Sequence, residues 1–171
     1  PLKDLDLVVE GPMAWPALVL AEAIVAAAAA SQLPPGYQLL QCTPHSSYGT
    51  ARLQLQINGQ LLLCDLSSAR SESYGFPGAQ PVVQPANLQI DLQRRDFSLN
   101  AMAMRIPRLE LLDPLGGAAD LAARQLRLLH GSSLRDDPTR LLRAVRYGAR
   151  FDLQWAPASW EQASVMLNSW P

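Results

Sequence analysis

Residues 4–10 read Asp-Leu-Asp-Leu-Val-Val-Glu, and the alternation of acidic and apolar side chains at the start of this stretch predicts a β-strand. Successive side chains of a strand point to opposite faces, so Leu5 and Leu7 share one face while Asp4 and Asp6 share the other. The two carboxylates then lie about 7 Å apart along the strand. A sheet that contains this strand therefore presents a pair of acidic groups on one face.

The residues that follow predict a small sheet around this strand. Gly11-Pro12 ends the strand, and a helix is expected over residues 14–32. Alternating apolar residues predict three further strands, over residues 37–43, 50–57 and 60–66. Asn58-Gly59 is a typical two-residue hairpin turn, so the last strand returns antiparallel and brings Asp65 into the sheet.

Asp65 can join Asp4 and Asp6 in a cluster of three carboxylates on one sheet face. Like charges held close together repel, and divalent cations with oxygen ligands relieve that repulsion. Mg²⁺ prefers carboxylates together with substrate phosphates, which favours two-metal phosphoryl or nucleotidyl transfer. The alternative is that the aspartates lie on the solvated face of an edge strand, and the spacing alone leaves both interpretations open.

The second half of the chain is expected to be largely helical. Ser67–Pro85 is rich in Ser, Gly and Pro and predicts a long loop, whereas Asn87–Met104 has apolar residues near helical spacing. Shorter elements follow, namely strands over residues 109–112 and 126–129 and helices over residues 118–124, 137–149 and 158–170. The last helix is expected to expose an apolar face around Trp160, Val165, Met166 and Leu167.

The composition is that of one folded domain, or of one domain and part of another, with 171 residues of which 49% are hydrophobic. Cys42 and Cys64 lack the spacing of a metal site, which predicts free thiols in a reducing, cytoplasmic setting. The apolar run Met13–Ala30 contains Pro16 and Glu22 and is rich in alanine. It therefore predicts a buried helix, and no membrane contact is expected.

Charge is distributed unevenly along the chain. Residues 1–93 carry 3 basic and 7 acidic side chains, whereas residues 94–150 carry 11 basic and 6 acidic ones. All the basic residues except Lys3 are arginines, whose guanidinium groups suit bidentate contacts with phosphates, although a GC-rich genome also enriches arginine. The second half is thus a candidate phosphate-binding segment.

Two local patterns in this basic segment place donors beside acceptors. Asp96 follows two arginines and would share a helix face with Asn100, and Asp137 would meet Arg140 at the start of a helix. An acceptor beside a forked donor matches the hydrogen-bonding edge of a nucleic-acid base. The simpler alternatives are a solvated polar face for the first pattern and a helix N-cap with a local ion pair for the second.

Seven segments in this order resemble the class II tRNA nucleotidyltransferases, or CCA-adding enzymes, and their bacterial poly(A) polymerase relatives. They are KDLDLVVEG (3–11), YGTARL (48–53), CDLSSARSESY (64–74), RRDFSLNAMAM (94–104), LLDPLGGAADL (111–121), LR (126–127) and RDDPTRLLRAVRYGARF (135–151). The resemblance implies an α+β fold with a polymerase-β-like nucleotidyltransferase head over residues 1–130. This head would hold a small mixed or antiparallel sheet flanked by helices, and the start of an all-helical neck would follow over residues 131–171.

The resemblance also implies roles for individual residues. Asp4 and Asp6 match the paired ligands of two Mg²⁺ ions, and Asp65 matches a third catalytic carboxylate that activates the 3′-hydroxyl of the RNA. Nucleotide binding is implied for six residues, among which Asp137 and Arg140 would read the Watson–Crick edge of CTP or ATP: Arg95, Asp96, Asn100, Asp137, Arg140 and Arg143. A flexible loop that helps to switch between the two bases is implied for Arg70, Glu72 and Tyr74.

The implied function is Mg²⁺-dependent transfer of CMP and AMP from CTP and ATP to the 3′ end of tRNA in the cytoplasm. YGTARL (48–53) favours the CCA-adding branch, and the alternatives are a poly(A) polymerase or an enzyme that adds only CC or only A. An alternative of another class is a non-catalytic nucleotide-binding or RNA-binding fragment.

Two departures from the family pattern bear on these expectations. Asp136 stands where the family has a glutamate in Glu-Asp-x-x-Arg, so the side chain that should orient the motif is one methylene shorter. The Gly-Gly-x-Val-Arg-Asp turn of the family does not occur before Asp4, and no body or tail domain follows the neck. The sequence is therefore expected to be the middle of a longer protein.

Overall fold

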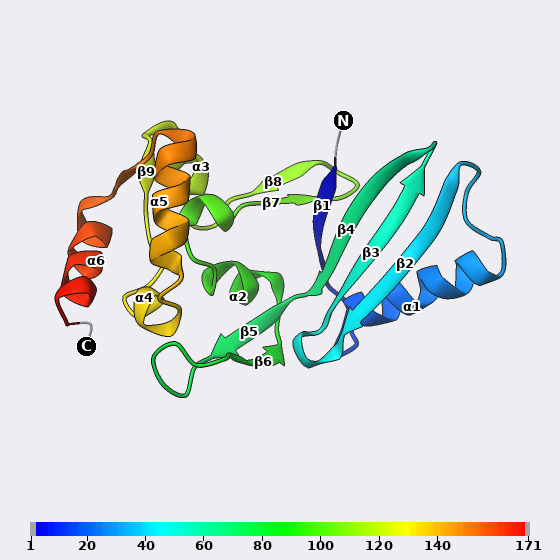
Figure 1. The fold of residues 1–171 in the computed structure, drawn as a ribbon, viewed down its shortest axis with the longest axis horizontal. Coiled ribbons are helices and arrows are strands. Elements are labelled where there is room, and N and C mark those ends of the chain that lie inside the picture. The colour runs from blue at the N-terminus through cyan, green and yellow to red at the C-terminus, as the bar shows by residue number, and fades with distance from the viewer. Residues whose placement is uncertain (1–2, 170–171) are drawn as a thin grey trace. The chain divides into compact units, whose positions relative to one another are not determined.

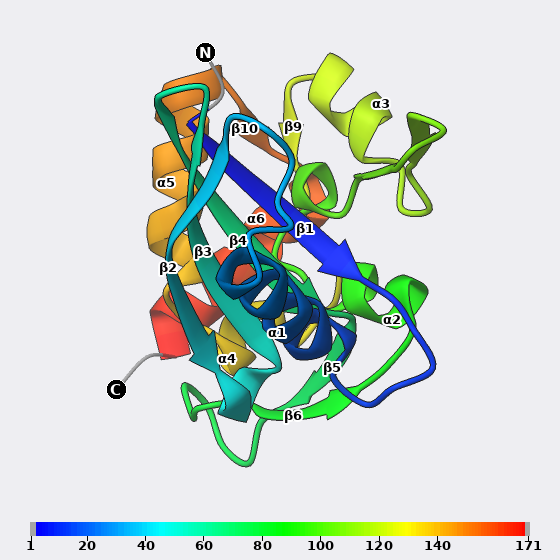
Figure 2. The ribbon, with the colours of Figure 1, turned by 90° about the vertical axis from the view of Figure 1, so that its right-hand side faces the viewer.

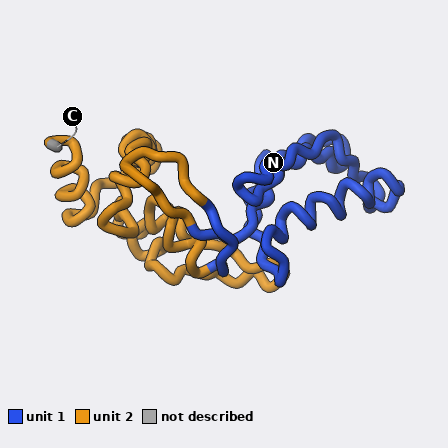
Figure 3. The backbone as a smooth tube through the Cα atoms, turned by 90° about the horizontal axis from the view of Figure 1, so that it is seen from below, with its two compact units in different colours: residues 1–71, 83–88 blue, residues 72–82, 89–171 orange. Residues whose placement is uncertain are grey.

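The computed structural model describes residues 3–169 and divides the chain into two compact units (Figure 3). Unit 1 comprises residues 1–71 and 83–88, and unit 2 comprises residues 72–82 and 89–171. This division follows packing, so the expected boundary between head and neck at residue 130 stays a prediction. Within residues 3–169, none of the helices has both the length and the apolar character that a membrane crossing needs.

Unit 1 is built on a four-stranded mixed sheet (Figure 1). In spatial order its strands are β1 (Asp4–Val9), β4 (Gln60–Ser68), β3 (Thr50–Ile57) and β2 (Tyr37–His45). β1 pairs with β4 in parallel, and the other neighbouring strands pair antiparallel. The turn between β3 and β4 is Asn58-Gly59, with φ of 48° and 82°, which confirms the predicted hairpin.

Helix α1 (Pro16–Ala29) covers one face of this sheet (Figure 2). Ala17 and Ala21 are buried in one apolar cluster with side chains of β3 and β4, and the free cysteine Cys64 belongs to the same cluster. The opposite side of the helix is solvated, since Val19 and Leu20 are 37% and 38% exposed. The predicted helix is therefore present and packs one face against the sheet, with Leu18 and Ile24 partly buried beside the alanines, but it is not buried on all sides.

A tight turn joins β2 to β3 and fixes the start of α1. The 3₁₀ helix η1 (Ser46–Tyr48) ends at Gly49, which has a φ of 62°. A Cβ on Gly49 would lie 2.0 Å from Cε3 of Trp15, so no larger residue fits there. Ser68, at the end of β4, accepts the N–H of Ala17 at 3.0 Å and so satisfies a donor in the first turn of α1.

Residues 67–85 contain two short strands where the sequence predicts a long loop. The strands β5 (Arg70–Ser73) and β6 (Val82–Pro85) form a two-stranded sheet. The hydroxyls of Ser71 and Ser73 donate to the carbonyl oxygens of Gln84 and Val82, each at 3.4 Å. The glycines of the segment, Gly75 and Gly78, lie in the turn between the strands, but Ser71, Ser73 and Pro85 lie in the strands, so the loop prediction is wrong for the strands.

The rest of the chain is mainly helical. Its helices are α2 (Leu88–Gln93), α3 (Gly117–Ala122), α4 (Ser133–Asp136), α5 (Arg140–Phe151) and α6 (Pro157–Ser169), with a 3₁₀ turn η2 (Ser98–Asn100). β7 (Ala103–Arg105) and β8 (Glu110–Leu112) form an antiparallel hairpin, and β9 (Gln125–Leu126) pairs in parallel with β10 (Gln154–Trp155). The core of unit 2 gathers around the fully buried Phe97, with Leu126, Leu128, Leu134, Ala144, Leu153 and Ala163.

The predicted helix over residues 87–104 is wrong beyond Gln93. A continuing helix would need the N–H of Ser98 for the carbonyl of Arg94, but Ser98 donates instead to the carbonyl of Arg127 at 3.0 Å. Phe97 pairs with Leu128 in an isolated β-bridge. Tertiary hydrogen bonds therefore replace the helical ones, a competition that local spacing cannot reveal.

The last two helices are close to their predicted positions. α5 begins at Arg140, and Thr139 before it makes no side-chain capping bond. Asp137 is extended, with φ −139° and ψ 94°, and its Oδ1 accepts the N–H of Thr139 at 3.0 Å, which is the capping contact predicted for Asp137 followed by Pro138. In α6, Trp160, Val165 and Leu167 are exposed as predicted, whereas Met166 packs against the core. Trp170, the end of the predicted helix, lies outside the described residues.

Candidate functional site

The aspartates of β1 and β4 lie on the sheet face that α1 does not cover. Leu5 and Leu7 pack in the cluster with α1, and the alternation of the strand turns Asp4 and Asp6 to the other face. Asp6 and Asp65 are register partners on adjacent parallel strands, about 4.8 Å apart at their backbones. The sheet therefore gathers the three predicted carboxylate residues on one face of unit 1.

Arg52 of β3 lies directly opposite Asp65, and its guanidinium forms a bidentate ion pair with the Asp65 carboxylate. Arg52 Nε donates to Asp65 Oδ1 at 2.7 Å, and Nη2 donates to Oδ2 at 2.8 Å. These hydrogen bonds, with the positive charge of Arg52 and of a nearby His45 when protonated, hold the pKa of Asp65 below its usual range. Sequence reasoning missed Arg52 as a site residue, although its outward position in an alternating strand is the signal that would find it.

No group of three or more His, Cys, Asp or Glu side chains in residues 3–169 is placed to hold a metal ion together. Asp65 shares the sheet face with Asp4 and Asp6 and is bound to Arg52, and the metal-binding and catalytic roles of the three residues stay predictions. Asp4 and Asp6 are exposed and supply only oxygen donors. A pair of carboxylates open to solvent fits Mg²⁺, which prefers oxygen ligands and keeps several of its waters.

The second group of predicted site residues lies in unit 2, where Asp96 is its centre. Asp96 Oδ1 accepts the N–H of Phe97 and the side-chain amide of Asn100, each at 2.8 Å, and Oδ2 lies 3.0 Å from Arg143 Nε. Asn100 also donates to the hydroxyl of Tyr147 at 3.2 Å. Asp96 and Asn100 thus meet as predicted, but in a turn and not on a helix.

Arg140 is buried, with only 3% of the residue exposed, and its guanidinium binds backbone oxygens. Nη2 donates to the carbonyl of Arg94 at 3.1 Å, and Nη1 donates to the carbonyl of Arg95 at 3.3 Å and to Ser133 Oγ at 2.6 Å. These carbonyls belong to the turn that ends α2. Arg140 therefore holds the Arg94-Arg95-Asp96 turn in place.

Asp137 joins the two arginines of α5. Asp137 Oδ2 accepts from Arg143 Nη2 at 2.7 Å and lies 3.8 Å from Arg140 Nε. Oδ1 accepts the backbone N–H and the hydroxyl of Thr139 at 3.0 and 2.5 Å. Burial alone would raise the pKa of Asp137, but the bonds from Thr139 and the two arginine charges outweigh it and lower that pKa. Asp137 is therefore an ionised acceptor at neutral pH.

Two N–H groups in this cluster lack hydrogen-bond partners. The Nε atoms of Arg140 and Arg143 are both buried and make no hydrogen bond, because the nearby carboxylate oxygens are too distant or poorly aligned. Buried donors are nearly always satisfied in folded proteins, so such exceptions need an explanation. Arg143 Nε still lies 3.0 Å from Asp96 Oδ2 in an ion pair, and Arg140 Nε lies 3.8 Å from Asp137 Oδ2. N–H donors beside the ionised Asp137 complement a planar ligand edge that carries an acceptor next to a donor.

Asp91 anchors the arginines of the motif, and sequence reasoning missed it. This fully buried carboxylate accepts from Arg94 Nη2 at 2.6 Å and from Arg95 Nη2 at 2.9 Å. Burial would raise the pKa of Asp91, but both arginines outweigh it and lower the pKa. The signal in the sequence is its spacing, three and four residues before the arginine pair on one helix face.

The residues expected in a flexible loop have defined partners. Arg70 and Glu72 lie in β5, and Arg70 donates to the carbonyl of Tyr48 at 2.7 Å. Glu72 pairs with Arg94 at 2.7 Å and accepts the Tyr74 hydroxyl at 2.8 Å. Burial, followed by these contacts with Glu72, raises the pKa of Tyr74 to about 12. Their role in switching between bases stays a prediction.

The LLDPLGGAADL segment (111–121) packs against the turn that carries Asn100. Asp120 of α3 accepts from the buried Ser98 hydroxyl at 2.6 Å and from Arg127 Nε at 2.7 Å. Gly117 packs against the backbone of Ser98, where a Cβ would lie 2.2 Å from the carbonyl oxygen. The segment therefore fixes η2, which carries Asn100.

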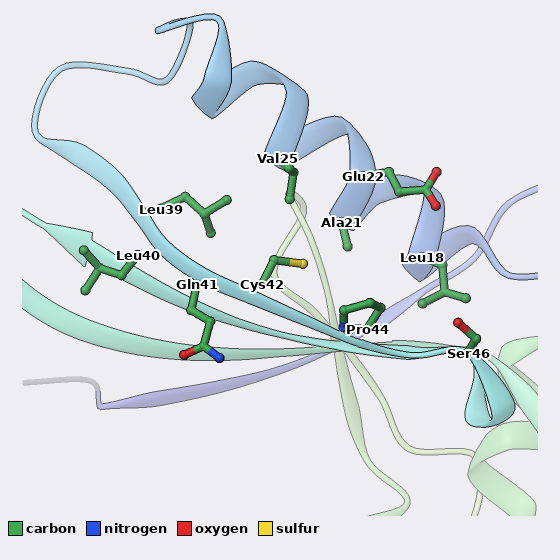
Figure 4. Close-up of a pocket in the computed structure, with 10 residues that line it drawn as sticks. All are labelled: Leu18, Ala21, Glu22, Val25, Leu39, Leu40, Gln41, Cys42, Pro44 and Ser46. Carbon is green, nitrogen blue, oxygen red and sulfur yellow. The ribbon is translucent and has the colours of Figure 1, made fainter.

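A cavity of about 460 Å³ lies elsewhere in unit 1, between α1 and the edge strand β2 (Figure 4). Leu18, Val25 and Leu39 give it an apolar wall, and Glu22 and Gln41 lie at its border. None of the predicted site residues lines it. The candidate functional residues form two separate groups, the acidic face of unit 1 (Asp4, Asp6 and Asp65) and the arginine cluster of unit 2 (Asp96, Asp137, Arg140 and Arg143).

Comparison with known proteins connects these residues to one family. The family model described as the poly A polymerase head domain matches residues 2–127. An A-adding tRNA nucleotidyltransferase of Halalkalibacterium halodurans is 38% identical over 91% of this chain and 33% of its own length. A CC-adding tRNA nucleotidyltransferase of Deinococcus radiodurans is 41% identical over 90% of this chain and 37% of its own length.

A solved structure shares the fold. It is a tRNA nucleotidyltransferase in complex with a primer tRNA and an incoming ATP analog, with a TM-score of 0.72 and 30% identity over 98% of this chain and 42% of that one. The mixed sheet and the helices around it thus confirm the predicted α+β fold. The chain spans between 33% and 42% of the length of these proteins.

Proposed function

The chain belongs to the poly A polymerase head domain family, and from this membership we propose that it is the catalytic part of an enzyme that adds nucleotides to the 3′ end of tRNA. The substrates are CTP and ATP, and the products are the extended tRNA and pyrophosphate. The relatives that support this reaction are named A-adding and CC-adding tRNA nucleotidyltransferases. The free thiols of Cys42 and Cys64 fit a reducing compartment, so we place the reaction in the cytoplasm.

The observation that carries the proposal is the ionised Asp137 beside the guanidinium groups of Arg140 and Arg143. Arg140 Nε and Arg143 Nε are buried without hydrogen bonds, and the carboxylate of Asp137 lies between the two arginines as an acceptor. Cytosine and adenine each present ring-nitrogen or carbonyl acceptors next to an exocyclic amino donor, which this arrangement complements. Arg95, Asp96 and Asn100 lie next to it and would hold the ribose.

In the reaction, the oxygen of the tRNA 3′-hydroxyl forms a bond to the α-phosphorus, the bond to pyrophosphate breaks, and the hydroxyl proton leaves. Asp4 and Asp6 would hold two Mg²⁺ ions, which when bound supply positive charge to the attacking and leaving oxygens. Asp65 would act beside them as the third carboxylate. Because Arg52 lowers its pKa, Asp65 is a weak base, and its carboxylate acts more by charge than by taking the proton.

We propose that the enzyme adds the complete CCA sequence. The alternatives are CC-only addition, A-only addition and poly(A) synthesis, and one assay distinguishes them. The full-length protein is incubated with Mg²⁺, labelled CTP or ATP, and tRNA that ends before CCA or before the final A. We expect CTP to be incorporated first and ATP to be added once the two cytidines are in place. Long adenosine tails would instead assign poly(A) synthesis, and incorporation of a single nucleotide type would assign a specialised enzyme.

A metal-ligand variant tests the acidic face. Asp4→Asn combined with Asp6→Asn should lower the rate by at least about 100-fold, since the charge that the metals supply is worth several kcal/mol. The fold should be as stable as before or slightly more so, because two like charges are removed. The matched control is Asp152→Asn, an exposed carboxylate in a surface ion pair with Arg124, which should leave the rate unchanged. A double variant that retained more than a few percent of the activity would contradict the assigned role.

A further inference from the structure

A row of polar side chains connects Asp136 to Arg140 through Ser132 and His130, and the proposed reaction does not use it. Ser132 Oγ donates to Asp136 Oδ2 at 2.9 Å, and it lies 3.1 Å from Nδ1 of His130. The other ring nitrogen of His130, Nε2, lies 3.4 Å from Arg140 Nη1. His130 is thus placed between the hydroxyl of Ser132, which donates to Asp136, and the buried Arg140 of the arginine cluster.

The proton positions in this row follow from the chemistry of its ends. Arginine has only N–H donors, so the Arg140 contact is a hydrogen bond only if Nε2 of His130 carries a lone pair. Nη1 has two hydrogens for three acceptors, so the N–H that reaches His130 at 3.4 Å is shared with the carbonyl of Arg95 at 3.3 Å. The proton of the neutral ring must then be on Nδ1, which donates to Ser132 Oγ. The Ser132 hydroxyl is left free to donate to Asp136, whose carboxylate only accepts. Every donor therefore points from Arg140 towards Asp136.

We propose that His130 is a positioning residue for nucleotide binding, which as the neutral Nδ1–H tautomer accepts a hydrogen bond from Arg140 and so steadies its guanidinium. This inference rests on the proposed function, because it assigns a regulator to the same cluster. A protonated imidazole would turn an Nε2–H towards Nη1 of Arg140 and place two positive groups 3.4 Å apart. Nucleotide affinity then falls when His130 takes up a proton.

The charges around His130 favour the neutral ring. Burial, and then the positive charge of Arg140 on α5, lower the pKa of His130, while Asp136 on α4 opposes them. Asp136 is 4.0 Å from Nδ1, so Ser132 and not a direct ion pair makes the main connection. This geometry also gives the shorter side chain of Asp136 a role. Asp136 is the last acceptor in the row of hydrogen bonds and is linked to His130 through Ser132, and it does not contact Arg140 directly.

The tautomer can be measured without any activity. Imidazole nitrogen spectra of the full-length protein at about pH 8, compared with those of His130→Gln to identify the signal, should show Nδ1 protonated and Nε2 unprotonated. Ser132→Ala removes the acceptor of Nδ1–H and should increase the share of the Nε2–H tautomer. An Nε2–H tautomer in the unmodified protein would overturn the proposal.

Binding tests the positioning role. The affinities of CTP and ATP are measured from about pH 8 to about pH 5 for the unmodified protein, His130→Gln and His130→Asn. The Gln side chain can place its amide oxygen near the position of Nε2 but does not titrate, whereas the shorter Asn cannot reach Arg140. We expect His130→Gln to bind as the unmodified protein does at pH 8, and His130→Asn to bind about fivefold more weakly, the value of one hydrogen bond.

The pH series separates positioning from a merely structural role. The phosphates of the nucleotides titrate near pH 6, but this effect is common to all variants and cancels in the ratio of affinities. The nucleotide affinity of the unmodified protein, divided by that of His130→Gln, should fall about fivefold or more as the pH drops below about 6.5. A constant ratio would overturn the proposal. Absence of CTP and ATP binding by every variant at every pH would refute the proposed function itself, and the tautomer measurement would still decide the state of His130.

Discussion

Arg140→Ala tests whether the buried arginine of α5 holds the turn that follows α2. The guanidinium donates to the carbonyls of Arg94 and Arg95 and to Ser133 Oγ, and only 3% of Arg140 is exposed. A hydrogen bond to a charged group is worth about 1.5–3 kcal/mol, and removing one partner of a buried polar cluster costs about 3–5 kcal/mol because the others lose their contacts. We therefore expect Arg140→Ala to lower the free energy of unfolding by about 3–5 kcal/mol.

Urea unfolding followed by circular dichroism measures this loss, and a urea dependence of about 2 kcal/mol per M converts it to a midpoint shift of about 2 M. Arg150→Ala is the control on the same helix, since Arg150 is exposed and stacks on Phe151 at 5.1 Å. That variant should change the free energy of unfolding by about 1 kcal/mol or less. A loss below 1 kcal/mol for Arg140→Ala would refute the reasoning. Base selection is therefore better tested with Asp137→Asn, which keeps the turn.

Two further variants test the supports of the candidate site. Gly117→Ala should destabilise the protein by about 3 kcal/mol in thermal unfolding, because the new Cβ would lie 2.2 Å from the Ser98 carbonyl, whereas Gly131→Ala, with open space around it, should change little; equal effects of both would contradict the packing argument. Arg52→Ala should raise the pKa of Asp65 towards its unfolded value of about 3.9. A carboxyl whose pKa is lower in the folded state stabilises the fold at pH values above its unfolded pKa. The free energy of unfolding of Arg52→Ala should therefore lie below that of the unmodified protein by a constant amount above about pH 5, and this difference should shrink as the pH falls through the folded pKa of Asp65. A difference that stayed constant down to about pH 2 would speak against the ion pair.

The sequence by itself determines the sheet of unit 1 and the faces of its strands. The alternation in residues 4–10 and the Asn58-Gly59 turn are local signals, and they correctly place Asp4, Asp6 and Asp65 on one face. The seven motifs also identify the family, because their order along the chain is a property of the sequence alone. The same motifs also predict which residues of the arginine cluster bind nucleotide, although they do not predict the contacts of those residues.

Only the tertiary structure decides which partners those residues take. Asp65 binds Arg52 across the sheet, and Arg140 takes carbonyls that a longer α2 would have used, so the predicted helix over residues 87–104 ends at Gln93. Asp91 and His130 become important only through contacts that folding creates. The physical reason is that hydrogen bonds between distant residues compete with local ones, and the outcome depends on burial, which local spacing does not contain.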